Sequence, residues 1–342
     1  MKDLELAVSI VVPCHNSSAT VARTLDALVA QDFALPYRIV AVDDGSTDNT
    51  LAILKSYERH YPAIVIVVAQ PHGNLPRARN AGLPLALAAK YVGFCDSDDL
   101  PHADFISALY ALAERTHADC AVMNYRNVAN GVAKTNRSFF AIPRVMRGID
   151  AAYQVLKDGK CKAYVWNKLF RADLLTRNGI DFLPENFTYE DTVFTFQCFL
   201  MSERVAFSPY AIYDYMIRDD SLSHEPNPNA FLMHINAYAA CRAYLGFYFG
   251  RKAGRRMFYR VRFTLRAKVL ADIMTARIAY AMPLRRVNYI SKRFLAEVTG
   301  LKLPIVNRPW ERYIGDLPLF IQVLPDERSE AALDGGMLWK NA

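Results

Sequence analysis

The sequence has no uninterrupted apolar run of about 18 residues and no Cys-x-x-Cys pair. Without such a run we expect no membrane-spanning helix. The N-terminus "MKDLELAVSIVVP" has acidic residues ahead of a short apolar stretch and no cleavage-like site, so it does not read as a signal peptide. The six scattered cysteines are typical of small, reduced core residues. We therefore expect a cytoplasmic protein.

Two further absences narrow the expected architecture and function. No tract is low in complexity, and 52% of the 342 residues are hydrophobic, which is enough for a packed core and favours two domains. No Gly-rich phosphate loop with a following lysine stands near the first expected strand. That absence argues against a nucleotidyltransferase, which would use the same kind of α/β crevice.

The first 125 residues alternate between short β-branched runs and amphipathic segments. This alternation with short links predicts an α/β fold with a mainly parallel, twisted sheet and helices on both faces. Pro84 is an awkward residue near the middle of one expected helix. The expected strands are 7–13, 37–45, 63–69, 91–96 and 119–125, and the expected helices are 17–31, 46–61, 76–90 and 103–115.

Beyond residue 130 the pattern loosens, and a Pro/Asn-rich break at 224–229 separates it from a region that reads as almost wholly helical. We expect helices within 147–159, 163–179 and 188–203, and strands with a turn within 205–221. The domain boundary is expected near residue 226, which gives a first domain of 1–225 and a helical, basic second region of 226–342.

Acidic pairs follow two of the expected strands, Asp43–Asp44 after the second and Asp96–Asp98 after the fourth. Ligands of open α/β sheets bind outside the carboxyl ends of the strands, so both pairs should face one crevice. The second pair could cap the next helix, or it could hold a divalent metal through hard oxygen ligands. The "DDG" of the first pair is either a turn or a base-reading site at Asp44.

Two more segments combine charge with an expected helix start. Arg77 and Arg79 in "PRARNAGL" could bind a phosphate or could be two solvated arginines. The acids of "YED" at 189–191 could simply favour the N-terminus of a helix. Alternatively, Asp191 could act as a general base that takes a proton from a hydroxyl.

Five of these segments, taken in order, resemble the family 2 inverting glycosyltransferases of the GT-A fold, bacterial surface-polysaccharide type. The segments are "SIVVPCHN", "VDDGSTDNT", "ARNAGL", "FCDSDD" and "YEDTVF". No single one is specific, but the ordered set is, and the resemblance covers about residues 7–225. It implies a nucleotide-diphospho-sugar transferase that moves a sugar to a hydroxyl of a glycan or lipid-linked glycan acceptor, with inversion.

On the donor side, the resemblance implies a role for each matching residue. Asp44 would read the base, with a uridine diphosphate (UDP) sugar as the favoured donor, and Arg79 would lie near the donor phosphates. Asp96 would lie toward the ribose and sugar, and Asp98 would bind Mg²⁺ or Mn²⁺ on the diphosphate. The positions that border the nucleotide are Pro13 and His15.

On the acceptor side, the resemblance implies that Asp191 is the catalytic base, with Glu190 as a supporting or acceptor-side neighbour. The stretch "VWNKLFR" at 165–171 resembles a segment that lines the acceptor, where Trp166 could stack on a sugar or could simply be buried. In "IRDDSLSH" at 217–224, Arg218 could pair with phosphate and His224 could be a further metal ligand, or the segment could be a surface turn.

The basic charge of the chain is concentrated in one segment. Between Arg251 and Arg293 there are thirteen Lys or Arg residues and one acid, Asp272. Helices with apolar and basic faces often lie on anionic lipid, so residues 250–293 predict either a peripheral contact with the inner face of the membrane or a helical bundle with a solvated basic face. We expect no nucleic-acid partner. The alternative to a transferase is a non-catalytic lipid- or polyanion-binding protein on a degenerate transferase scaffold.

Overall fold

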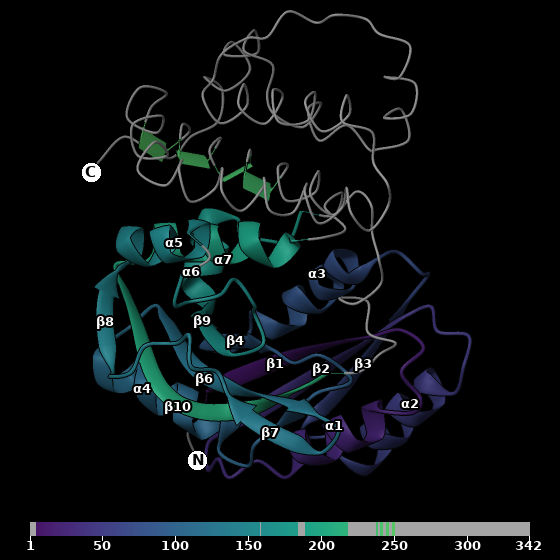
Figure 1. Ribbon diagram of the computed structural model, residues 1–342. Coiled ribbons are helices and arrows are strands. Elements are labelled where there is room, and N and C mark those ends of the chain that lie inside the picture. Colours follow the sequence, from purple (N-terminus) through teal and green to yellow (C-terminus); the bar gives the residue numbers. More distant parts are fainter. Residues whose placement is uncertain are drawn as a thin grey trace, which may run out of the picture.

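The structure, a computed structural model, describes residues 5–157, 159–183 and 189–217, and eight positions between 237 and 249. Figure 1 shows these residues as a sheet with helices on both sides. Arg218, His224, the basic segment 250–293 and almost all of the expected second domain lie outside the described residues.

One ten-stranded sheet forms the centre of the fold, with β3, β2, β1, β4, β9, β6, β10 and β5 in that spatial order. The first four strands of this order run parallel, as the strand–helix alternation predicts. Strand β9 is antiparallel to both of its neighbours, β4 and β6, so the sheet is mixed at this point. The strands are β1 (Val8–Cys14), β2 (Tyr37–Asp44), β3 (Val65–Gln70), β4 (Tyr91–Phe94), β5 (Leu100–Pro101), β6 (Cys120–Ala129), β7 (Val132–Thr135), β8 (Arg144–Arg147), β9 (Lys168–Arg171) and β10 (Arg204–Met216).

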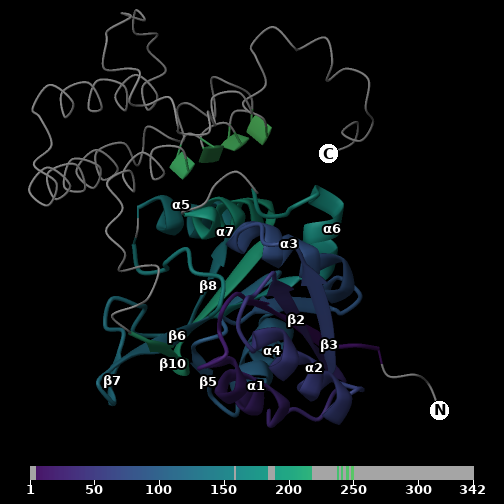
Figure 2. The same cartoon turned by 90° about the vertical axis from the view of Figure 1, so that its right-hand side faces the viewer.

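Helices cover both faces of this sheet and form two separate cores. Helices α3, α5, α6 and α7 lie over one face and α1, α2 and α4 over the other (Figures 1 and 2). Alternate residues of each buried strand point to opposite faces, so Val11 belongs to the first core and Ile10 to the second. The helices are α1 (Val21–Val29), α2 (Thr50–His60), α3 (Leu75–Ala86), α4 (Phe105–Thr116), α5 (Gly148–Leu156), α6 (Ala172–Asn178) and α7 (Glu190–Met201).

The segment 163–179 contains the expected helix, but a strand that the sequence pattern did not predict precedes it. Lys168–Arg171 is the strand β9, and α6 follows it directly, ending at Gly179 in the left-handed conformation. Four residues are too few to show an alternation, and these are buried or nearly so, with strands on both sides. Pro84 lies inside α3, which continues past it to Ala86.

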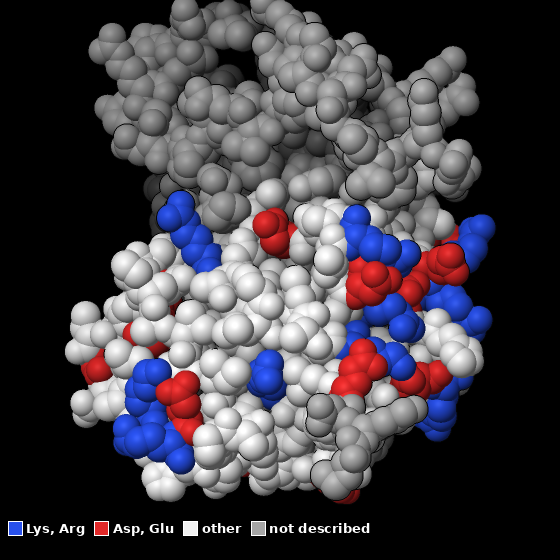
Figure 3. Space-filling view, turned by 180° about the vertical axis from the view of Figure 1, so that it is seen from behind, with Lys and Arg blue, Asp and Glu red and all other residues white. Residues whose placement is uncertain are grey.

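Charge and thiol chemistry in the described residues agree with an ordinary packed domain. All six cysteines are buried and unpaired, and burial raises the pKa of Cys120 to about 12. No described helix is long and apolar enough to cross a bilayer. On the face drawn in Figure 3, Lys and Arg are interspersed with Asp and Glu among the described residues.

The close packing of α5 against the end of α7 predicts that replacing Gly148 destabilises the fold. A Cβ atom there would lie 2.0 Å from the Ser202 carbonyl oxygen and 2.1 Å from that of Phe199. We expect Gly148→Ala to lower the free energy of unfolding by about 3 kcal/mol, as severe overpacking does, measured by urea denaturation. Gly159→Ala is the control, since its Cβ would meet the movable side chain of Gln154. Equal stability of the two variants would contradict this packing.

Candidate active site

The parallel register brings the ends of β1, β2 and the segment after β4 to one edge of the sheet. Cys14 at the end of β1 pairs with Asp43, and Val11 in the same strand pairs with Phe94. Pro13 is buried in β1 and His15 follows the strand, exposed. The two acidic segments therefore lie on either side of the end of β1.

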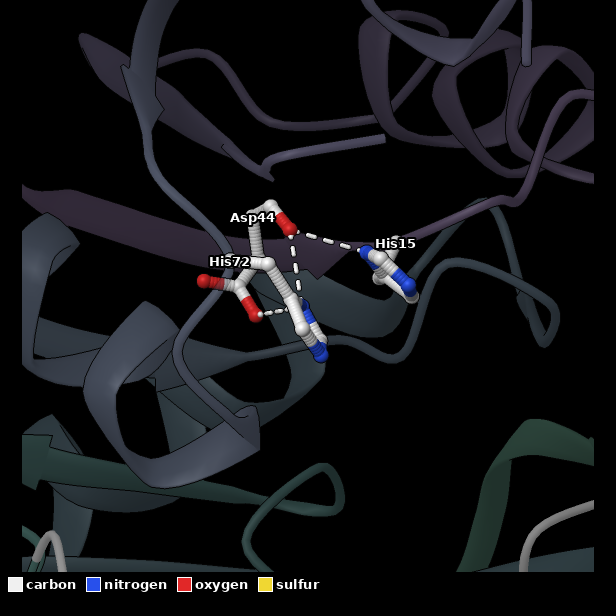
Figure 4. A group of neighbouring side chains, drawn as sticks. All are labelled: His15, Asp44 and His72. Atoms are coloured by element: carbon white, nitrogen blue, oxygen red, sulfur yellow. Dashed lines mark hydrogen bonds and ion pairs between the residues drawn. The ribbon is translucent and has the colours of Figure 1, made fainter. Parts of the chain in front are cut away.

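Asp44 is a buried carboxylate held by hydrogen bonds from a neighbouring loop (Figure 4). Its Oδ1 accepts hydrogen bonds from the side chain of Gln70 and from the Gly73 backbone N–H, the latter at 3.0 Å. Its Oδ2 lies 2.9 Å from Nδ1 of His72. Gly45 makes this arrangement feasible, because its φ is +64° and a Cβ there would come within 2.5 Å of the His72 backbone nitrogen.

The side chains of His15 and His72 stack next to Asp44, with ring centroids 4.0 Å apart. Together with Asp44, they form the group of three potential metal ligands that the described residues contain. However, Nδ1 of both rings faces the Asp44 carbonyl oxygen, at 2.8 and 3.1 Å (Figure 4). A nitrogen facing a carbonyl oxygen carries the proton and cannot also bind a metal. Through Nδ1, both rings therefore form a hydrogen-bonded frame around Asp44.

The acidic loop after β4 is fixed through its backbone. The Thr24 hydroxyl donates to the carbonyl oxygens of Ser97 and Asp99, at 3.1 and 2.8 Å, and Arg23 donates to that of Asp98 at 3.1 Å. Asp99 is buried and accepts the Met216 N–H at 2.8 Å.

Burial raises the pKa of Asp99, and the charges of Asp96 and Asp98 raise it further. These neighbouring acids are half-buried. The loop thus concentrates negative charge in a small volume at the edge of the sheet.

Arg79, on α3, joins this loop to the start of α7. Arg79 is 1% exposed, and its guanidinium donates to three carboxylates, Glu190 Oε1 at 2.8 Å, Asp191 Oδ1 at 2.6 Å and Asp96 Oδ1 at 3.2 Å. We name these four residues the Arg79 cluster. The "ARN", "DSD" and "YED" segments therefore meet at one cation, although 111 residues separate Arg79 from Glu190.

The two acids of α7 sit where burial opposes ionisation. Burial and the charge of Asp191 raise the pKa of Glu190 to about 8, against the opposing effect of Arg79. Burial also raises the pKa of Asp191, and Asp96 adds to this, while Arg79, Lys168 and a hydrogen bond from the Val165 backbone oppose it. A carboxylate with a raised pKa and a fixed position is what a general base requires.

Of the two alternatives for Trp166, the structure supports the buried one, and two further residues near the site had no sequence signal. Trp166 is 3% exposed and stacks between Tyr164 and Tyr213, so it is a core residue and offers no open face to a sugar. No motif in the sequence indicated His72 or Lys168. His72 contacts Asp44, and Lys168 lies close enough to Asp191 to act on its charge. Arg218 and His224 lie outside the described residues.

The fold and part of the sequence are similar to those of known proteins. The structure of Staphylococcus aureus TarS residues 1–349 in complex with UDP-GlcNAc is similar, with a TM-score of 0.62 and 22% identity over 94% of this chain and 82% of that one. The fold is therefore the GT-A fold. Residues 9–177 match the model of glycosyl transferase family 2. This segment of the chain belongs to that family.

Curated relatives carry related names. A poly(ribitol-phosphate) beta-glucosyltransferase of Bacillus spizizenii is 29% identical over 234 residues, which are 66% of this chain and 35% of that protein. The poly(ribitol-phosphate) beta-N-acetylglucosaminyltransferase TarP of S. aureus is 29% identical over 217 residues, 61% of this chain and 62% of that one. This chain thus matches about a third of the first relative and under two thirds of the second.

The raised pKa of Glu190 predicts how stability depends on pH. The folded protein keeps the Glu190 proton up to about pH 8, while the unfolded chain loses it near pH 4.5. This group's contribution is therefore full below pH 4.5 and is lost as the pH rises to 8. Glu190→Gln cannot lose a proton, so its melting temperature should improve relative to the unchanged protein between pH 5 and 8. Thermal melts of both proteins across that range test this, and parallel curves would contradict it.

Proposed function

We propose that this chain transfers a sugar from a nucleotide-diphosphate donor to a hydroxyl group of a cell-surface polymer, with inversion at the anomeric carbon. The observation that carries this proposal is the Arg79 cluster. It holds the candidate base Asp191 and the donor-side acid Asp96 on the same guanidinium, at 2.6 and 3.2 Å. A base and a donor-side acid fixed on one rigid group are suited to a single displacement on a sugar placed between them.

In this mechanism Asp191 takes the proton of the acceptor hydroxyl while the acceptor oxygen attacks the anomeric carbon. The bond to the nucleotide diphosphate breaks on the opposite face of the sugar, which inverts the configuration without a covalent enzyme intermediate. Glu190, with its raised pKa, supports the base and leaves the negative charge mainly on its neighbour. Arg79 keeps both acids in place.

The donor-side residues fit a divalent cation, Mg²⁺ or Mn²⁺. Asp96 and Asp98 supply the hard carboxylate oxygens that such an ion prefers, in a loop whose crowded charges favour a cation. Within the described residues no third His, Cys, Asp or Glu completes a metal group with them, so diphosphate oxygens would fill the remaining positions. When bound, the ion would neutralise charge on the departing diphosphate. We include Arg218 and His224 as further candidates for this side of the site.

The proposed donor is a UDP-sugar and the proposed acceptor a polymer or lipid-linked glycan. The similar TarS structure holds UDP-GlcNAc, and the curated relatives are named for glucosyl or N-acetylglucosaminyl transfer to poly(ribitol phosphate). In this proposal the nucleobase of the donor lies against Asp44, and Pro13 and His15 border the nucleotide. The basic segment 250–293 would bring the enzyme to an anionic membrane surface on the cytoplasmic side, where a lipid-linked acceptor is presented.

The catalytic assignment predicts different outcomes for two acids. We expect Asp191→Asn to lower UDP release from UDP-glucose or UDP-GlcNAc by about a hundredfold or more, because the base is lost, while UDP still binds. Asp98→Ala should remove both turnover and the metal dependence of UDP binding. The control is Asp173→Asn, an exposed acid of α6. Unchanged turnover in both site variants would refute this assignment of the catalytic residues. If the unchanged protein itself released no UDP from any UDP-sugar with Mn²⁺, a non-catalytic binding protein would be favoured instead.

The proposed recognition of the nucleobase by Asp44 predicts a change in melting temperature that depends on the nucleotide. UDP with Mn²⁺ should raise the melting temperature of the full chain, since a ligand at a hundred times its Kd stabilises the folded state by about 2.7 kcal/mol. Asp44→Asn should reduce that shift, and GDP should give a smaller one in the unchanged protein. If UDP raised the melting temperature of both proteins equally, Asp44 would not be the residue that recognises the nucleobase.

A further inference from the structure

Lys168, the first residue of β9, is a fully buried lysine. The chain segment around its side chain contacts Asp191. Its Nζ donates to the Lys162 carbonyl oxygen at 3.0 Å, to the Tyr164 carbonyl oxygen and to Asn167 Oδ1 at 2.8 Å. A protonated ammonium has three N–H donors, which matches these three oxygens, whereas a neutral amine would turn a lone pair toward one of them. The contacts therefore require the charged form, although burial lowers the pKa of Lys168.

These three hydrogen bonds fold residues 162–167 into a tight loop. We name residues 162–167 the lysine loop. The Lys168 backbone N–H also donates to the Val165 carbonyl oxygen at 3.2 Å, and Thr195 of α7 donates through its hydroxyl to Ala163 at 2.6 Å. The lysine loop is thus tied to the same helix whose first turn carries Asp191.

The lysine loop contacts Asp191, the candidate catalytic base. The Val165 backbone hydrogen-bonds the Asp191 carboxylate, and the Lys168 charge acts on that carboxylate as well. Arg79 reaches Asp191 from α3. Asp191 is therefore held from two directions, by a guanidinium on one element and by a loop with its own buried cation on another.

Charge balance gives Lys168 a reason to be a cation. The Arg79 cluster contains one positive group and three carboxylates, Asp96, Glu190 and Asp191. Because its raised pKa keeps Glu190 protonated at neutral pH, the guanidinium faces two negative charges, those of Asp96 and Asp191. One guanidinium does not neutralise both, and an uncompensated buried charge is costly. A second buried cation whose charge acts on Asp191 reduces this imbalance.

We propose that Lys168 is a positioning residue for the proposed transfer reaction, which folds the lysine loop so that the Val165 N–H and a buried positive charge hold the Asp191 carboxylate in its reactive position. This proposal rests on the proposed function, because it assigns Lys168 a role through Asp191. Lys168 itself does not touch the donor or the acceptor. Its removal should therefore affect the chemical step and leave donor binding intact.

The test is Lys168→Met in the full chain, assayed by UDP release from the UDP-sugar that the unchanged protein turns over. We expect kcat to fall by about tenfold or more, while KM for the donor and the Kd of UDP with Mn²⁺ stay within about twofold. If this variant does not fold, Lys168→Gln, which keeps a donor for the loop carbonyls but removes the charge, takes its place. A kcat equal to that of the unchanged protein overturns the proposal.

A matched control variant and a double variant distinguish a positioning role of Lys168 from a purely structural role. Tyr37→Phe removes a buried hydroxyl that donates to Leu28 and Val29, far from the site, and should lower the melting temperature without changing kcat. In the Asp191→Asn background, Lys168→Met should have no further effect on the residual rate, because both act through one carboxylate. Additive losses overturn the positioning role. Full activity of Asp191→Asn alone would instead overturn the proposed function.

Discussion

The site depends on one buried guanidinium that is shared by acids from two distant parts of the chain. Arg79 reaches Asp96 after β4 and the two acids that open α7, and its own helix packs against β1 and β2. Because a charge pair in a dry environment is costly unless its geometry is well satisfied, this arrangement fixes where α7 begins relative to the sheet. The proposed base Asp191 and the proposed donor-side acid Asp96 are thereby placed by the same guanidinium.

Most of the first half of the fold could be predicted because its elements are locally encoded. The runs around Val11 and Val40 are long enough and sufficiently β-branched to predict strands. Parallel pairing follows from the helices between them, and it then places Asp44 and Asp96 at one edge. The order of the charged segments carries the family resemblance, so the positions of the candidate site residues were also open to prediction.

The remainder depends on contacts that no local pattern encodes. Strand β9 is four residues long, so its pairing with β4 and β6 had no detectable period in the sequence. The sequence suggested Arg79 as a phosphate neighbour, but its contacts with three carboxylates depend on long-range packing. Lys168 is one lysine in the segment "VWNKLFR", and only the loop that folds around it reveals its surroundings.

The six cysteines have a practical consequence for work on this protein. Each is buried, and burial raises the pKa of every one of these thiols, so few thiolates are available to alkylating reagents. A cysteine introduced at an exposed position such as Ser138 would then be the preferred target of a maleimide dye. Fluorescent labelling for single-molecule or binding studies would therefore not require a cysteine-free background.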